Sequence, residues 1–457
     1  MRYSAQLAEV RFGYGMSPVV APPASPEAML TALAAPDEMA TRFPIDSFER
    51  FSAWVVETRK LRKAFQKTKN QDKREAYRAA RRAQNEVGME WAMRAMLRCT
   101  HTQSGFRERL VAFWADHFTA KGKIGLLRTA TAPYIEDAIR PNVTATFGDM
   151  LSAVVTHPLM LHFLDQNRST GPNSKAVKRN DRLEGLNENL AREVMELHTL
   201  GVGGPYSQDD VRQLAELFTG LTFGFGEGFQ FRRGFAEPGA EQIMGKSYGG
   251  DPARLEPVLE ALNDLAVHPV TARHIASKLA VHFVSDTPDE GLVAHVTERY
   301  LASGGDLMAV YTALLEHPAA WDTPRGNVKP PVDFIASGWR ALAVDPDHVA
   351  RLRRRAMRRT LVNPLRDMGQ PWQDPNGPDG WPEQDAAWIT PQGVAMRLRW
   401  AVSAPQVLCP DLPEPMGFVA STLGDFADEH VQFAARAAES QSDAVGMVLA
   451  APAFQRR

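Results

Sequence analysis

Residues 187–220, NENLAREVMELHTLGVGGPYSQDDVRQLAELFTG, contain two amphipathic segments on either side of a glycine-rich turn. Apolar side chains recur there at helical spacing, at Leu190, Val194, Leu197, Val211, Leu214 and Phe218. Ser207 and Asp210 have the spacing of a capping box, so the second helix is expected to begin after Ser207 and to end near Gly220. The stretch therefore predicts two consecutive helices.

The same helical spacing extends over most of the chain and predicts a mostly α fold, with one large multi-helix domain over residues 1–457. The pattern changes in LTFGFGEGFQFRR, residues 221–233, where phenylalanines alternate around Gly226-Glu227-Gly228. This alternation predicts a small inserted β-hairpin near 221–232, within a hairpin insertion at 221–250. Residues 369–390 are rich in Pro, Gly and Trp and predict an irregular loop.

Composition excludes several classes of protein. With 44% hydrophobic and 23% charged residues, the 457-residue chain is neither disordered nor fibrous, and its net charge of -2 excludes a globally basic nucleic-acid binder. Cys99 and Cys409 supply neither a disulfide framework nor a zinc-binding CxxC pair. We find no secretory signal and no apolar run of about 18 residues. We therefore expect no membrane span and a cytoplasmic location, with export to the periplasm alongside a partner as the alternative.

Positive charge is concentrated in two stretches. A long basic helix is expected at about 57–97, and its residues 59–82 contain most of the Lys and Arg, while residues 351–359 read RLRRRAMRR. A solvated helix face is the simpler interpretation, and a nucleic-acid or anionic-polymer surface is the alternative. Phe65 and Tyr77 are the only aromatic residues between 59 and 86, which disfavours base stacking. No specific nucleic-acid partner is therefore expected.

Polar side chains gather between His157 and Phe218, around the first of the two helices quoted above. At about 100° per residue, Glu193 and Glu196 lie about 60° apart and can share a ligand or a proton, whereas His198 projects away from both. Glu188, Arg192 and Glu196 are spaced for a ladder of ion pairs. Three interpretations remain open for these residues: a structural network, an acid–base or metal site, and an anion site at 175–179.

The acid–base hypothesis names specific residues. The candidate catalytic residues are Glu193, Glu196, His117 and His198, and the candidate substrate-binding residues are Arg192, Asn189, Trp114, Asp165, Asn167, Asn173 and Trp381. They are expected to line a cleft between the Trp114 helix, the 165–185 loop and the Glu193 helix. No HExxH or ExxH spacing occurs here, so a divalent metal is compatible with the carboxylates but is not indicated, and the cofactor stays open. A further pair, His274 and Lys278, is expected to face solvent.

These stretches resemble a bacterial family catalogued as domain of unknown function 1800. The resemblance is strongest at 187–220. It is also carried by RFGYGMSP at 11–18, RERLVAFWADHFT at 107–119, HPLMLHFLDQNRSTGPNS at 157–174, HPVTARHIASKLAVHFV at 268–284, MGQPWQDPNGPDGWP at 368–382 and APAFQRR at 451–457. The resemblance implies a mostly helical fold and assigns no catalytic residues. It also implies a frequent genomic neighbour, a sulfatase-like protein.

The chain departs from that family pattern at one place. Relatives commonly have a His-Asp-x-Gly-x-Lys stretch after the hairpin, whereas residues 234–245 read GFAEPGAEQIMG. If the family's chemistry needs that histidine, it is missing here or replaced by Glu237 or Glu241. Two hypotheses follow, and the sequence leaves open whether the protein is an enzyme. The first, which we favour at this point, is an accessory protein for the co-encoded sulfatase-like partner; the alternative is a hydrolytic or metal-assisted enzyme with a Glu/His/Arg site around the 187–200 helix.

Overall fold

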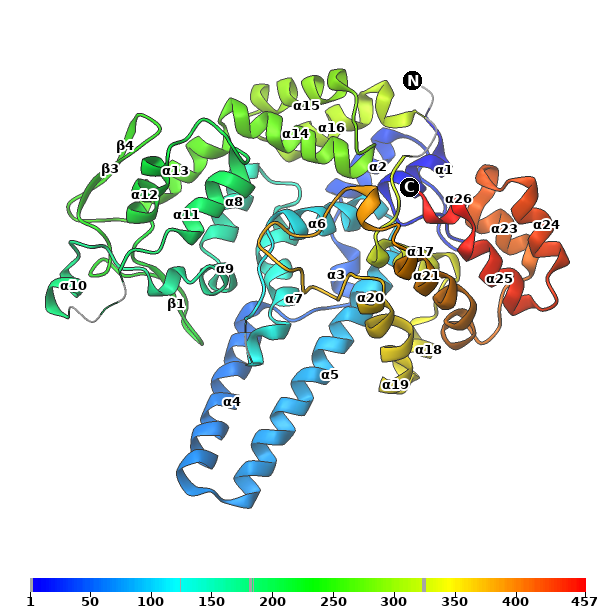
Figure 1. Ribbon diagram of the computed structural model, residues 1–457, viewed down its shortest axis with the longest axis horizontal. Helices are drawn as coiled ribbons and strands as arrows, with labels where there is room; N and C mark the ends of the chain where they lie inside the picture. Colours follow the sequence, from blue (N-terminus) through cyan, green and yellow to red (C-terminus); the bar gives the residue numbers. More distant parts are fainter. Residues whose placement is uncertain (1–2, 124, 181–182, 184, 323–325) are drawn as a thin grey trace.

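The computed structural model describes residues 3–123, 125–180, 183, 185–322 and 326–457. Helices dominate these residues, and the only described strands form two separate antiparallel pairs, which confirms the predicted mostly α fold. Figure 1 shows two long helices that project from the helical body.

The first group of helices surrounds α6 (Gly105–His117), which is the centre of the larger hydrophobic core. Its other main members are α8 (Phe147–Val155), α9 (Pro158–Phe163), α11 (Asn189–Glu193), α12 (Gln208–Leu217), α13 (Glu256–Ala266), α14 (Pro269–Phe283), α15 (Glu290–Ala302) and α16 (Leu307–Glu316). Phe113 and Trp114 of α6 pack among Phe118, Phe147 and Phe283. Nearly every turn of α6 is buried, so its polar residues lie inside the protein.

A second core is formed by helices late in the chain. They are α17 (Pro331–Ala341), α18 (Pro346–Arg351), α19 (Arg354–Met357), α20 (Asn363–Asp367), α21 (Pro391–Ser403), α22 (Pro405–Leu408), α23 (Pro415–Leu423), α24 (Glu429–Ala437), α25 (Gln441–Ala450) and α26 (Pro452–Gln455). Phe334 of α17 packs its ring edge-on against Trp400 and Phe454. The loop 369–390 joins α20 to α21 and crosses in front of α6, so it bridges the two cores (Figure 1).

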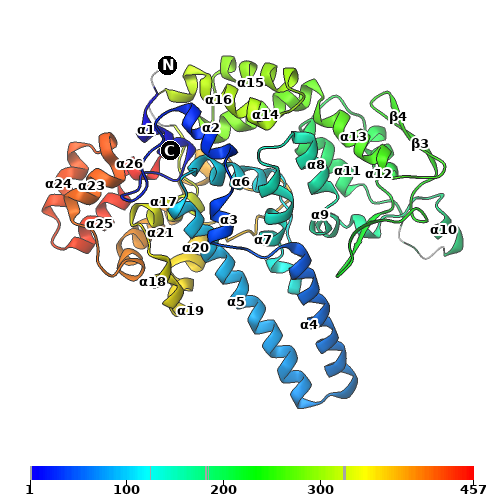
Figure 2. The same cartoon turned by 180° about the vertical axis from the view of Figure 1, so that it is seen from behind.

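The predicted long basic helix is wrong in one respect, because the chain reverses within it. Two helices, α4 (Phe48–Thr68) and α5 (Gln71–His101), pack side by side and project from the body as an arm (Figure 2). Lys69 adopts a left-handed conformation with φ 52°, and the Asn70 side chain accepts hydrogen bonds from the backbone N–H groups of Asp72 and Lys73. A left-handed residue followed by an Asn cap ends one helix and begins the next.

The predicted hairpin forms, and a second one follows it. Strands β1 (Leu221–Gly224) and β2 (Gly228–Phe231) pair in register, with Leu221 opposite Phe231. Strands β3 (Gly239–Ile243) and β4 (Lys246–Gly250) form a second antiparallel pair that packs against α12. The remaining elements are short: α1 (Ala5–Leu7), η1 (Ala8–Phe12), α2 (Pro26–Ala34), α3 (Glu38–Arg42), η2 (Gly125–Thr129), α7 (Thr131–Tyr134), η3 (Ile135–Ile139), η4 (Arg140–Asn142), η5 (Gln166–Arg168), α10 (Lys175–Arg179), η6 (Val194–Thr199), η7 (Pro318–Trp321), η8 (Arg358–Val362), η9 (Asp385–Ala387) and η10 (Gly424–Phe426).

Candidate functional site

The ion-pair ladder predicted on the first of the two quoted helices is present. Arg192 lies between Glu188 and Glu196, with N–O distances of 3.1 and 3.3 Å, and all three side chains are partly exposed. Glu193 next to them is half-buried, and its pKa is raised by burial and then by the neighbouring Glu196. Glu193 is also within electrostatic range of Asp379 in the 369–390 loop, so this helix lies near that loop.

The helix contains a π turn, which takes Leu197 out of the buried face on which its spacing placed it. Residues 194–199 form the π-helical segment η6, in which the Thr199 hydroxyl donates to the carbonyl oxygen of Val194 at 2.6 Å. A π turn inserts one extra residue into the helical repeat and rotates everything after it. As a result Leu197 is only partly buried, and His198 takes the fully buried position.

His117 and His198, two of the candidate catalytic residues, do come together. Their ring centroids lie 6.1 Å apart, and His117 Nε2 is 3.2 Å from the backbone oxygen of His198. Burial lowers the pKa of both rings, that of His198 to about 3, so both are neutral at physiological pH. Both nitrogens of His198 and Nδ1 of His117 have no hydrogen-bond partner among the described residues. Unpartnered polar atoms in a core are costly and deserve a functional or solvent explanation.

The remaining sequence candidates are scattered. Trp114 is fully buried and donates its indole N–H to the Tyr311 hydroxyl at 2.6 Å, so it packs in the core and lines no cleft described here. Asp165 pairs with Lys123 at 2.6 Å, and the Asn173 amide donates to Glu237 at 2.5 Å, so both hold the 165–185 loop in place. Asn189 is exposed at the start of α11 and Asn167 is partly buried in η5. Residues 181, 182 and 184 of this loop lie outside the described part of the chain.

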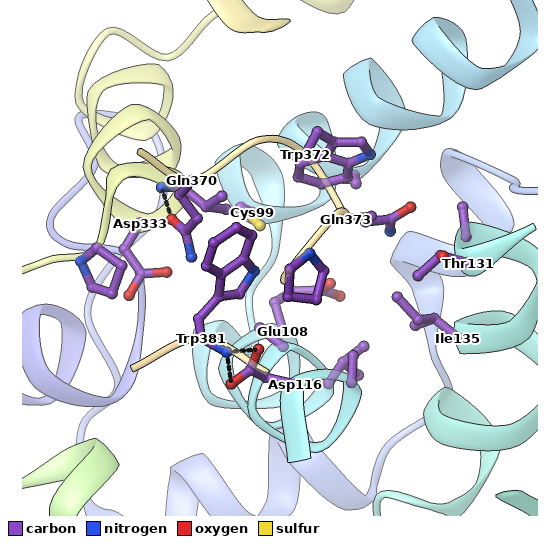
Figure 3. Close-up of a pocket in the computed structure, with 18 of the residues that line it drawn as sticks. Cys99, Glu108, Asp116, Thr131, Ile135, Asp333, Gln370, Trp372, Gln373 and Trp381 are labelled. Carbon is purple, nitrogen blue, oxygen red and sulfur yellow. Dashed lines mark hydrogen bonds between the residues drawn. The ribbon is translucent and has the colours of Figure 1, made fainter. Parts of the chain in front are cut away.

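Trp381, the last sequence candidate, leads to a different site. Its backbone N–H donates to both carboxylate oxygens of Asp116 in α6, at 3.0 and 3.2 Å. The adjacent Gly380 is required for this approach, because its φ is +76° and a Cβ there would lie 2.8 Å from Asp116. Figure 3 shows the indole of Trp381 above Asp116 and Glu108, with Trp372 on the far side of the cavity.

The cavity in Figure 3 lies between α5, α6 and the 369–390 loop and has a volume of about 200 Å³. Its walls are mainly apolar, and charged side chains stand at its margins, including Asp116, Glu108, Asp333 and Glu383. A second, larger hollow of about 650 Å³ lies on the other face of the same loop, against α14. Trp381, Pro382, Glu383 and Trp388 line both, so this strip of loop is the partition between them.

Asp116 is a buried acid with perturbed proton affinity. Burial raises its pKa to about 8, and the neighbouring Glu383 adds to the rise, against the opposing effects of the Trp381 N–H and Lys278. Asp116 is therefore largely protonated at neutral pH and can donate a proton. Cys99 borders the same cavity, but burial raises the pKa of its thiol, so the unreactive thiol form prevails.

A network of buried charged residues holds one wall of the cavity in place. Asp333 of α17 accepts from both Arg109 and Arg457, and Glu383 accepts from His282 Nδ1 at 2.8 Å. Arg109 Nη2 lies 2.9 Å from His282 Nε2, and because an arginine can only donate, Nε2 is the acceptor and Nδ1 carries the proton. With both ring nitrogens occupied, His282 holds Glu383 in position and is not free to act as a base.

The prediction that His274 and Lys278 face solvent is wrong. Both lie on the face of α14 that packs against the core and the loop. Lys278 is one helical turn from His274 on one side and one turn from His282 on the other. His274 Nε2 is 3.3 Å from the backbone oxygen of Leu197, and burial lowers the pKa of His274 to about 4. Burial likewise lowers the pKa of Lys278, against the opposing pull of Asp116 and Glu383.

Sequence reasoning did not name Asp116, Asp379 or Glu383, and it did not place Lys278 or His282 among the site candidates. Asp116 is the neighbour of the candidate His117 in the sequence. The spacing of His274, Lys278 and His282 by four residues is also visible there, but the sequence does not show which element packs against that helix face. Glu383 and Asp379 come from the irregular loop, more than ninety residues further along the chain. Among the described residues, no group of three or more His, Cys, Asp or Glu side chains is placed to hold a metal ion.

The chain matches one known protein family over almost its whole length. Residues 8–456 match the family described as protein of unknown function (DUF1800), and the chain belongs to that family. No curated protein and no solved structure matches it. Over the part of the chain that the structure describes, none of the helices is both long and apolar enough to cross a bilayer.

Proposed function

We propose that the chain is an enzyme that uses acid–base chemistry where α6, α14 and the 369–390 loop meet. The observation that carries this proposal is the neighbouring pair of Asp116, whose pKa is raised to about 8, and Lys278, whose pKa is lowered. An acid whose pKa is raised and an amine whose pKa is lowered can exchange protons near neutral pH. Such pairs concentrate at catalytic sites. The site lies beside the 187–200 helix, through Asp379 and Glu193, so the enzyme alternative is retained with a different set of residues.

The chemistry available is proton donation by Asp116 to an oxygen that becomes more basic during reaction. Polarised carbonyl and acyl bonds react in this way, and their hydrolysis is one such reaction. Asp116 borders a cavity with mainly apolar walls, where each charge acts on a bound substrate more strongly than it would in bulk water. Trp372, Trp381 and Trp388 supply flat apolar walls against which the body of a substrate can pack.

The test is a screen of wild type and Asp116→Asn against chromogenic acyl and carbonyl substrates. Wild type should turn over at least one class, with a rate that falls above about pH 8 as Asp116 loses its proton. Asp116→Asn should lower that rate by roughly 10²–10⁴-fold, the usual contribution of a general acid. The exposed Asp347→Asn is the matched control. Equal rates for wild type and Asp116→Asn on every substrate turned over would overturn the proposal.

A second candidate function, an accessory protein with a partner, is favoured by the arm. Helices α4 and α5 project from the body (Figure 1), and the outward residues Arg74, Arg78 and Arg82 are spaced by four residues and exposed. Arg354 of α19 approaches Glu86 at 3.8 Å, so the two basic stretches predicted from the sequence adjoin each other. A partner with an acidic surface, such as the co-encoded sulfatase-like protein, complements this arm.

Co-purification tests the accessory role. The tagged chain should retain the co-encoded protein at low salt and lose it as salt is raised, because exposed charges are screened. An Arg74→Glu/Arg78→Glu/Arg82→Glu variant should lose the partner, whereas Glu188→Gln, which lies outside the arm and directly before α11, should keep it. A monodisperse monomer that ignores the neighbour at low salt would exclude this role.

A further inference from the structure

The cavity of about 200 Å³ owes its space in part to small side chains on α6. Ala112, Ala115 and Asp116 line it and are partly accessible, whereas the neighbouring Phe113 and Trp114 are buried in the core. A cavity of about 150 Å³ with apolar walls is large enough to bind benzene. The larger volume here therefore accommodates one six-membered ring with a short substituent.

The 369–390 loop supplies flat walls for this cavity. Trp372 and Trp381 border it from two parts of the loop (Figure 3), and Trp388 packs beside Trp381, with ring centroids 6.2 Å apart. Contact between two aromatic rings is more favourable than the buried area alone accounts for. A planar aromatic ring is therefore the shape that these walls fit best.

The walls are held in place by anchors along the loop. The Val332 N–H donates to Gln370 Oε1 at 2.8 Å, and Lys121 pairs with Asp374 at 2.7 Å. The backbone contact with Asp116 described above is a third anchor. The cavity is thus preformed, so a ligand that enters it meets little cost for ordering the protein.

Most carboxylates that line the cavity are matched by arginines. Glu108 and Glu136 belong to arginine pairs, and Asp333 accepts hydrogen bonds from two arginines. Glu383 lies 3.7 Å from Arg457. A ligand with a net charge would lose its hydration here and find these groups already engaged, which is costly. The cavity therefore favours an uncharged ligand.

Asp116 differs from these carboxylates, because the described group that contacts its oxygens is a backbone N–H and not a cation. Glu383 and Asp379 of the loop and Lys278 of α14 also act on it electrostatically, and together with burial they bring its pKa to about 8. At neutral pH Asp116 therefore retains its proton and offers an O–H donor at the cavity wall. A carbonyl oxygen on the ligand is a suitable acceptor for this donor.

We propose that this cavity binds a small uncharged aromatic amide or ester, with its ring against the tryptophans and its carbonyl oxygen accepting a hydrogen bond from Asp116. This inference rests on the acid–base function proposed above and names its substrate class. Benzamide is the simplest such molecule, and benzoate and benzamidinium are close isosteres with a negative and a positive charge. Because the three share one size and shape, their relative affinities report which charge the site accepts.

Titration calorimetry of the full-length wild-type protein at pH 7 with each of the three compounds tests the ligand class. Benzamide should bind at least about tenfold more tightly than benzoate or benzamidinium, because moving a charged group into a mainly apolar cavity costs more than one hydrogen bond restores. Equal or tighter binding of either charged compound would overturn the inference. Benzamide that does not bind in the millimolar range would overturn it as well.

Two variants locate the binding site. Ala115→Leu places a larger side chain in the cavity, and Trp372→Leu removes a ring from a partly exposed part of its wall. Each should weaken benzamide binding at least about tenfold, since each removes ring contacts or the space for them. The matched control is Ala395→Leu on the exposed face of α21, which should bind as wild type does. Unchanged benzamide affinity in both cavity variants would place the ligand elsewhere and overturn the inference.

Asp116→Asn separates the ligand class from the proposed function. Asn donates an N–H to a carbonyl and accepts the Trp381 N–H, but it cannot transfer a proton, so benzamide affinity should stay within about threefold of wild type while turnover falls. If benzamide does not bind and Asp116→Asn still lowers turnover, the ligand class fails and the acid–base function stands. If benzamide binds in this cavity and Asp116→Asn leaves turnover unchanged, the binding site stands and the acid–base function fails.

Discussion

Two sets of largely buried charges reach the cavity of about 200 Å³, one through Arg98, Glu108, Glu136 and Arg140 and the other through Asp116, and they are built differently. One, the paired network, consists of Asp37, Arg98, Glu108, Glu136 and Arg140. The other, the acid–amine pair, consists of Asp116 and Lys278. In the paired network each carboxylate meets an arginine directly, whereas Asp116 and Lys278 influence each other without a direct bond.

Each carboxylate of the paired network accepts hydrogen bonds from an arginine. Arg98 reaches both oxygens of Glu136, at 2.6 and 3.0 Å, and Arg140 reaches both oxygens of Glu108, at 2.6 and 3.0 Å. Arg140 also donates to Asp37 at 2.8 Å. Bidentate pairs of this kind fix geometry and leave no proton to exchange. The comparison indicates that a buried charge in a direct ion pair stabilises the fold, whereas a buried charge without such a partner is available for chemistry.

Breaking the paired network should have the largest effect on stability. Arg140→Met leaves both Glu108 oxygens buried without a partner, because the Glu108 side chain is only 4% exposed. Removal of one member of a buried pair costs about 3–5 kcal/mol, and urea unfolding should show a loss of that size. The double variant Glu108→Gln/Arg140→Met should recover part of the loss, since no uncompensated charge remains. A single-variant loss under ~1 kcal/mol would contradict the interpretation.

Glu383 lies within electrostatic range of both Asp116 and Lys278, and its stabilising effect should depend on pH. Burial raises its pKa, but His282, Arg457 and Lys278 outweigh burial and lower the pKa from 4.5 to about 2. A carboxyl with a depressed folded-state pKa stabilises above its unfolded pKa and loses that effect as pH falls. Glu383→Gln should therefore be less stable than wild type by about 3 kcal/mol at pH 7. The gap should close between about pH 4.5 and pH 2, and a gap that is constant with pH would contradict this pairing.

Asp116 should show the opposite sign. Its folded-state pKa is raised from 3.8 to about 8, so its protonated form is favoured by folding and wild type loses stability as pH rises between these values. Asn is neutral at every pH, so Asp116→Asn removes this loss. Relative to wild type, the variant should gain ~2 kcal/mol between pH 5 and pH 6.5, at about 1.4 kcal/mol per unit. Urea midpoints across this range provide the measurement, and parallel pH profiles would show that Asp116 is not buried as an acid.

Local signals in the sequence predicted much of the fold. The capping box of Ser207 and Asp210 is present, with both reciprocal hydrogen bonds, and the phenylalanine alternation forms β1 and β2. These features depend on residues three to ten positions apart, so the sequence contains all of their causes. The turn at Lys69 and Asn70 was missed because its flanks continue the same basic helical pattern, and no Gly or Pro marks it.

The site was harder to predict, because its geometry depends on contacts across the chain. The π turn in η6 rotates the side chains that follow it around the helix axis, and no residue between 194 and 199 indicates such a turn. The position of Lys278 in the helical repeat is one that a solvent-facing lysine would also occupy. It is covered only because the loop near Asp379 packs against this helix. Sequence periodicity identifies a helix face but not what will cover it. The sequence therefore pointed to the glutamates of the 187–200 helix, and not to Asp116 and Lys278 on the neighbouring elements.

The smallest expected effect separates those two sets of carboxylates. Glu196 is matched by Arg192 at 3.3 Å, as in the paired network, but this ladder is partly exposed. An i, i+4 pair on a helix surface contributes about 0.2–0.5 kcal/mol, so Glu196→Gln should destabilise by no more than that. It should also leave turnover unchanged, because a carboxylate held by arginine beside solvent has no reason to exchange protons with a substrate. Steady-state rates beside urea midpoints make the comparison, with Asp116→Asn as the contrasting variant. A large loss of turnover in Glu196→Gln with unchanged stability would move the catalytic site from the loop back to the 187–200 helix, and would show that exposure outweighs the absence of pairing in making a carboxylate reactive.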